Sequence, residues 1–273
     1  MADQPIGFET MSSALPDAIN YHRWLMSLLE PWLRGRVLEV GSGYGQYTVE
    51  IARHVQSLRA IDCDAECLAR LRGLPGHVDS MVADLSDPDF AQRVGTSSYD
   101  AIVCLNVLEH IEGDAQALRA LHHALAPGGC LLLIVPAHQA LYGPMDAMAG
   151  HVRRYGRLDL GSRLEAARYA VRELRYVNPL GGLGWWVNAK LLRPKNLSAP
   201  MVNRQILWFD RYVQPVSRRL DLLTSRWFGQ SLWPVGERSR PATGRRGVLR
   251  CAGSPGWSMP TVPGPSIATS SRR

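Results

Sequence analysis

Short apolar runs alternate with amphipathic segments over the first half of the chain. Runs typical of buried strands stand at 36–40, 58–62, 79–85, 100–106 and 130–137. Segments with apolar residues at helical spacing stand at 19–33, 46–55, 65–74 and 117–126. The run 130–137 is apolar throughout, as expected for a strand that is covered on both faces. Strands that alternate with helices predict βαβ units and a parallel sheet.

The pattern changes after Pro136. We expect a long polar and aromatic loop, with or without short helices, at 138–157, a helix at 160–169, and strands at 171–177 and 231–237. Residues 183–227 hold two helical stretches rich in aromatic residues, which we interpret as a cap on the sheet. The predicted organisation is one domain over 1–237, with an N-terminal helical segment (1–35) and this cap, followed by a tail at 238–273.

The positive charge of the chain is concentrated in that tail. The formal net charge is +7, and seven arginines and no acid lie from Arg238 onward. Residues 1–237 are therefore neutral overall, which argues against nucleic acid as a partner. The tail is rich in Gly, Pro and Ser and cannot bury enough apolar surface to offset the entropy of ordering it. We predict that it is largely disordered; the alternative is an arm attracted to phosphates or to a membrane.

The five cysteines form no CxxC pair and no Cys/His cluster with the spacing of a zinc site. Reduced thiols in a cytoplasmic protein, without a bound metal, are the expected state. No apolar run approaches the roughly 20 residues of a membrane-spanning helix, and the first ten residues do not read as a secretory leader.

Three glycines follow the first predicted strand in the stretch VLEVGSGYGQYT, residues 37–48. Glycine in such a turn lets backbone N–H groups approach a ligand, because no Cβ intrudes. The spacing is G-x-G-x-G, from Gly41 through Gly43 to Gly45. The dinucleotide pattern G-x-G-x-x-G fails, since Gln46 stands where its third glycine belongs.

Polar residues also end the next three strands. Asp62 lies 21 residues after Gly41, where a carboxylate can accept hydrogen bonds from both ribose hydroxyls of a nucleotide. Asp84 ends the third strand, where an adenine amino group could be met, and Asn106 ends the fourth. The carboxyl edge of a parallel sheet is where ligands bind, so the set predicts a nucleoside-containing cofactor there.

At this point the chain resembles the class I S-adenosylmethionine-dependent methyltransferases. VLEVGSGYG, RAIDCD, VADL and YDAIVCLNVLEHI are similar to their first four motifs in order, and LAPGGCLLLIVPA is similar to the segment around their fifth strand. The resemblance implies a Rossmann-like three-layer α/β sandwich with a seven-stranded, mostly parallel sheet whose last strand is antiparallel. The segment VPAHQALYGPMDAMAGHVRRYGR resembles a smaller set of bacterial enzymes of this family that act on small molecules.

The resemblance also implies which residues bind the cofactor. Gly41 and Gly43 would face its methionine part, with Glu39 anchoring the turn near its amino group. Asp62 would hold the ribose, while Asp84 and Leu85 would contact the adenine and Cys63 would lie beside the ring. The complete predicted cofactor set is Glu39, Gly41, Ser42, Gly43, Gly45, Asp62, Cys63, Asp84, Leu85 and Asn106.

Methyl transfer from a sulfonium mainly requires alignment of the reacting atoms, and a general base helps when the acceptor is a hydroxyl or a protonated amine. Three histidines near the expected carboxyl edge are candidates for that base: His110, His138 and His151. Tyr142, Arg153 and Tyr155 lie in the same loop as His151 and are the predicted substrate contacts. Each of these residues could instead have a role within the loop.

The sequence leads us to expect a cytoplasmic methyltransferase that acts on a small molecule, with oxygen as the acceptor atom. A nicotinamide-dependent oxidoreductase and a non-catalytic protein that binds S-adenosylmethionine are the alternatives. The aromatic cap, with interleaved basic residues, could pack as core, roof a hydrophobic pocket, touch a membrane surface or form a homodimer interface.

Overall fold

A computed structural model describes residues 17–71, 73–187 and 199–240. The predicted disordered tail therefore lies outside the described residues, apart from its first three positions. Arg238, where we placed the start of the tail, is the last residue of a strand, and its guanidinium donates to the carbonyl oxygens of His122 and Leu125.

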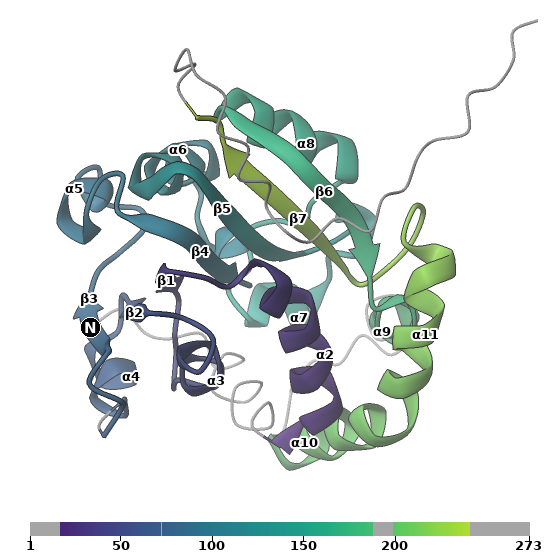
Figure 1. Cartoon of the computed structure of the whole chain (residues 1–273). Coiled ribbons are helices and arrows are strands. Elements are labelled where there is room, and N and C mark those ends of the chain that lie inside the picture. Colours follow the sequence, from purple (N-terminus) through teal and green to yellow (C-terminus); the bar gives the residue numbers. More distant parts are fainter. Residues whose placement is uncertain (1–16, 72, 188–198, 241–273) are drawn as a thin grey trace, which may run out of the picture.

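The centre of the molecule is a seven-stranded sheet with the order β3-β2-β1-β4-β5-β7-β6 (Figure 1). Its strands are β1 (Arg36–Val40), β2 (Ser57–Asp62), β3 (Val78–Val82), β4 (Tyr99–Leu105), β5 (Leu125–Pro136), β6 (Tyr169–Val177) and β7 (Ser231–Arg238). β7 runs antiparallel to both of its neighbours, whereas the other pairs are parallel. The predicted fold class is confirmed.

Helices cover both faces of the sheet. Successive residues of a strand point to opposite faces, so each strand packs against helices on both sides. In β4, Ile102 and Cys104 join a core cluster under α5 (Phe90–Val94), α6 (Asp114–Ala124) and α8 (Arg157–Ala166). Ala101 and Val103 join a second cluster under α2 (Ile19–Leu29) and α3 (Thr48–Ala52). One continuous apolar strand thus supplies two cores, which explains why the central runs lack polar alternation.

Several element boundaries differ from the predicted ones. α3 and α4 (Ala65–Ala69) are about half as long as the segments expected at 46–55 and 65–74. α4 begins where the Asp64 carboxylate accepts a hydrogen bond from the backbone N–H of Glu66 and caps the helix. β3 ends at Val82, so Asp84 lies in the loop beyond the strand. β5 begins at Leu125, before the predicted turn at 127–129, where Gly128 has a φ of 84°.

The cap consists of α9 (Pro179–Val187), α10 (Ala199–Trp208), a π-helical turn η6 (Phe209–Val213) and α11 (Gln214–Thr224). It packs beside α2 at the edge of the molecule (Figure 1). The buried Asp210 carboxylate accepts hydrogen bonds from the backbone N–H groups of Asn20 (3.1 Å) and Tyr21 (2.7 Å), at the positive end of α2. No helix in the described part of the chain combines the length and apolar composition needed to cross a bilayer.

Candidate active site

The turn after β1 needs glycine for two different reasons. Gly41 and Gly43 have φ angles of 73° and 51°, which side chains with a Cβ rarely adopt. A Cβ on Gly41 would also collide with the Val107 side chain, whereas a Cβ on Gly43 would meet no atom within 4 Å. Gly41 is therefore fixed by packing against the loop after β4, and Gly43 borders open space.

Asp62 at the end of β2 braces this turn. Its Oδ2 accepts a hydrogen bond from the backbone N–H of Gly43 (2.8 Å), and its Oδ1 accepts one from the N–H of Asp64 (3.0 Å). These bonds join the tips of β1 and β2 into one unit. The sequence predicted that both tips serve one ligand, but it did not predict that the carboxylate also holds the glycine turn in place.

Glu39 lies in β1 just before the turn and is only 3% exposed. Its Oε2 accepts a hydrogen bond from the Thr48 hydroxyl (2.7 Å). Burial raises the pKa of Glu39 to about 7, the hydrogen bond from Thr48 opposes that shift, and the nearby charge of Asp62 adds to it. Glu39 can therefore exchange a proton near neutral pH.

A cavity of about 1280 Å³ opens at this carboxyl edge of the sheet. Nine of the ten predicted cofactor residues line it, namely Glu39, Gly41, Ser42, Gly43, Asp62, Cys63, Asp84, Leu85 and Asn106. Gly45, with a φ of 78°, shapes the turn from behind and is not part of the cavity wall. The cavity continues past these residues to His110 and His151 and to the cap, so there is room for a second molecule beside a nucleoside.

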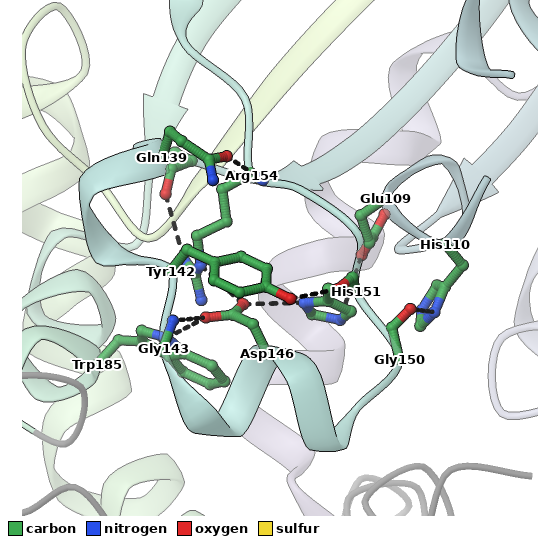
Figure 2. A network of polar contacts seen from close by, with 11 residues as sticks. Glu109, His110, Gln139, Tyr142, Gly143, Asp146, Gly150, His151, Arg154 and Trp185 are labelled. Atoms are coloured by element: carbon green, nitrogen blue, oxygen red, sulfur yellow. Dashed lines mark hydrogen bonds and ion pairs between the residues drawn. The ribbon is translucent and has the colours of Figure 1, made fainter. Parts of the chain in front are cut away.

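His151 is held by a buried carboxylate on the far side of that cavity (Figure 2). Its Nδ1 lies 2.9 Å from Oδ1 of Asp146, which is 0% exposed. The same oxygen accepts a hydrogen bond from Nε of Arg154 (2.7 Å). The other oxygen accepts bonds from the backbone N–H of Gly143 (3.0 Å) and from Nε1 of Trp185 (3.3 Å).

These contacts keep Asp146 ionised and orient the His151 ring. Burial alone would raise the pKa of Asp146, but the hydrogen bond with His151 and the charge of Arg154 outweigh it, so the pKa of Asp146 is lowered. An ionised Asp146 accepts from Nδ1–H of His151, which leaves the lone pair on Nε2. Nε2 is the atom that can take a proton from a molecule in the cavity.

Two further ionisable side chains lie beside His151. The His110 ring meets the His151 ring edge-on at 4.9 Å, and its Nδ1 lies 3.1 Å from the carbonyl oxygen of Gly150. Burial lowers the pKa of His110 to about 4, which keeps that ring neutral. Glu109 is 0% exposed, and within the described part of the chain neither of its carboxylate oxygens has a hydrogen-bond partner.

Burial raises the pKa of Glu109 to about 8. One ligand atom from each of Glu109, His110 and His151 lies within 4.8 Å of the others, so these are the described residues that could hold a metal ion. The prediction of a metal-free protein remains a prediction.

The other predicted catalytic and substrate residues lie away from the cavity wall. His138 stacks on Tyr176 with ring centroids 4.6 Å apart, and Tyr142 donates from its hydroxyl to the carbonyl oxygen of His151 (2.7 Å). Arg153 forms an ion pair with Asp114 (2.6 Å). Tyr155 is 0% exposed, and its hydroxyl donates to the Leu108 carbonyl (3.2 Å) and lies 3.1 Å from Asp114. Tyr142, Arg153 and Tyr155 thus hold the loop on which His151 stands, whereas the His138 ring packs against β6.

The sequence left the role of the cap open, with a pocket roof as one alternative, and gave no sign that Asp146 supports His151. Trp185, Gln205, Phe209 and Asp210 line the cavity, together with Tyr21 of α2. The Arg154 guanidinium lies over the Trp185 ring, 4.6 Å from its centroid. Asp146 and Arg154 lie in the predicted loop, but no sequence signal paired either residue with Trp185, which is 39 positions beyond Asp146.

Comparisons with known proteins agree with this architecture. The sequence matches the family described as a methyltransferase domain over residues 15–174, which is more than half of the chain. A ubiquinone biosynthesis O-methyltransferase from Xanthomonas oryzae pv. oryzae is 38% identical over 100 residues, which are 36% of this chain and 41% of that protein. The match thus spans about two fifths of the relative's length.

Two solved structures share the fold. An S-adenosylmethionine-dependent methyltransferase from Mesorhizobium loti has a TM-score of 0.53 at 18% identity, covering 80% of this chain and 98% of that one. The [4+2]-cyclase SpnF has a TM-score of 0.54 at 18% identity, covering 81% and 82%. Likeness at this level shows the fold alone. The family match shows that the chain belongs to the methyltransferase domain family, and its sheet has the topology that the class I resemblance implied.

Proposed function

We propose that this chain transfers a methyl group from S-adenosylmethionine to a hydroxyl oxygen of a small molecule, with His151 as the general base. The observation that carries the proposal is the single cavity that joins the glycine turn and Asp62 to the His151–Asp146 pair. The relatives are named ubiquinone biosynthesis O-methyltransferases, which supports oxygen as the acceptor atom.

The residues around the glycine turn fit the cofactor. Gly43 leaves open space, and the buried Ser42 hydroxyl has no hydrogen-bond partner among the residues that the structure describes. Asp62 would accept from the ribose hydroxyls, Glu39 would face the amino group, and Asp84 and Leu85 would contact the adenine. When bound, S-adenosylmethionine supplies an activated methyl group on a sulfonium, so no other activation of the methyl is needed.

The acceptor side of the cavity supplies orientation and a proton acceptor. His151 Nε2 would take the hydroxyl proton as the oxygen attacks, and Asp146 would stabilise the resulting imidazolium at Nδ1. His110, which stays neutral because burial lowers its pKa to about 4, adds no opposing charge at neutral pH. Trp185 and Phe209 close the cavity from the cap and offer apolar surface to the acceptor.

The proposal is tested with His151→Ala and His151→Gln, with His123→Gln as the control because His123 is exposed on α6. We expect both His151 variants to bind S-adenosylhomocysteine as the wild type does in calorimetry. Their kcat on a panel of hydroxylated small molecules, followed with labelled cofactor, should fall about 10²–10⁴-fold. An unchanged kcat would remove His151 from the reaction.

The two alternatives give different results in the same samples. A melting temperature raised by NAD and not by S-adenosylhomocysteine would favour an oxidoreductase. Tight binding of S-adenosylhomocysteine without turnover on any acceptor would favour a non-catalytic protein.

A further inference from the structure

The outward surface of the cap is apolar. We call the exposed side chains along α10, η6, α11 and the turn after it the outer cap face; its apolar members include Trp208, Tyr212, Val216, Leu222, Leu223 and Trp227. Leu222, Leu223 and Trp227 are 86%, 70% and 74% exposed. Exposed apolar residues scattered singly are ordinary, but a contiguous set on one helical segment marks an interaction site.

α11 is inverted relative to an ordinary surface helix. Its buried residues are polar: Gln214, Ser217 and Asp221, at a spacing of three and four. Asp221 accepts hydrogen bonds from Nε1 of Trp24 (3.0 Å) and from the backbone N–H of Asn178 (2.7 Å). Three apolar side chains of the same helix, Val216, Leu222 and Leu223, are exposed instead, so the burial of α11 does not follow its hydrophobicity.

The exposed charges on the outer cap face have one sign. Residues 199–227 contain five arginines, at 204, 211, 218, 219 and 226, and two acids. Both acids, Asp210 and Asp221, are buried and hydrogen-bonded to α2 and its surroundings, whereas all five arginines are exposed. The face thus combines aromatic and aliphatic side chains with positive charge alone.

We propose that the outer cap face docks on the surface of a bilayer that contains anionic phospholipids. Tryptophan, tyrosine and leucine would enter the boundary between headgroups and acyl chains, and the arginines would reach the phosphates. A second copy of this chain is a poorer occupant, because a two-fold contact would set the five arginines of one copy against those of the other.

The other side of the same segment lines the cavity, through Gln205, Ile206 and Phe209. Docking would therefore place one wall of the cavity against the lipid. An acceptor with an apolar tail could then pass from the bilayer to the site without crossing water. The docking itself does not depend on the proposed reaction.

The test measures co-sedimentation of the full chain with phosphatidylcholine vesicles, with and without phosphatidylglycerol. We expect binding that requires phosphatidylglycerol and that weakens about tenfold or more in the double variant Leu222→Gln/Leu223→Gln. Leu158→Gln is the matched control, because Leu158 is 87% exposed on α8. Arg218→Gln/Arg219→Gln should also weaken binding, unlike Arg119→Gln on the exposed side of α6.

Equal binding of the wild type and the Leu222/Leu223 double variant would overturn the proposal and leave the arginine-rich tail as the source of any affinity. A wild type that is dimeric in sedimentation velocity, with a monomeric double variant, would also overturn it. Melting temperatures show that the variants fold, and because both leucines are exposed we expect no loss of stability.

Discussion

Glu109 gives the sharpest test of how burial controls this site. It is 0% exposed without a hydrogen-bond partner for either oxygen, and burial raises its pKa from 4.5 to about 8. Replacement by Gln keeps the shape and removes the titration. In the wild type, the unfolded chain loses the Glu109 proton above pH 4.5, while the folded chain keeps it up to about pH 8.

The sign follows from this difference. Between these two pH values the folded state binds one more proton than the unfolded state, so the free energy of unfolding falls as the pH rises. Each pH unit is worth somewhat over 1 kcal/mol. The gap in stability between Glu109→Gln and the wild type should therefore widen by about 3 kcal/mol from pH 5 to pH 7 and level off above about pH 8.

Urea unfolding at pH 5, 6, 7 and 8 would measure the difference in free energy of unfolding between Glu109→Gln and the wild type. The contributions of the other ionisable groups largely cancel in this difference. Glu112→Gln is the control, because Glu112 is exposed three positions away, and its curve should run parallel to the wild type. Parallel curves for Glu109→Gln and the wild type would refute the reasoning and indicate that Glu109 is solvated or paired in solution.

Three further predictions concern the cofactor and metals. S-adenosylhomocysteine carries an ammonium group that would lower the pKa of Glu39 from about 7, so binding at pH 7 should release about half a proton in calorimetry across buffers, and Glu39→Gln should release none. Asp62→Ala removes the acceptor for the Gly43 N–H and for the ribose, so the Kd of S-adenosylhomocysteine should rise about 10- to 100-fold, with a smaller rise for Asp62→Asn; an unchanged Kd would reject the ribose assignment. Methyl transfer should persist in EDTA, whereas loss of activity that a divalent ion restores would assign a metal to Glu109, His110 and His151.

The sequence by itself determined the sheet and the edge of the sheet at which the cavity opens. The central strands followed from apolar runs, because a strand buried on both faces must be apolar at every position. The glycine turn, Asp62 and Asn106 could be placed because the carboxyl ends of parallel strands meet at one edge. Each of these inferences uses only residues close in the chain together with one topological rule.

Tertiary structure decided which loop and cap residues share the cavity. His138, His110 and His151 were all candidates for the base in the sequence, and only packing turned His138 onto Tyr176 and paired His151 with Asp146. Only packing likewise buried Tyr155, whose hydroxyl forms hydrogen bonds with the Leu108 carbonyl oxygen and the Asp114 carboxylate in the core. The inverted face of α11 was equally hidden, because a periodic pattern shows that a helix has two faces but not which one the rest of the protein buries.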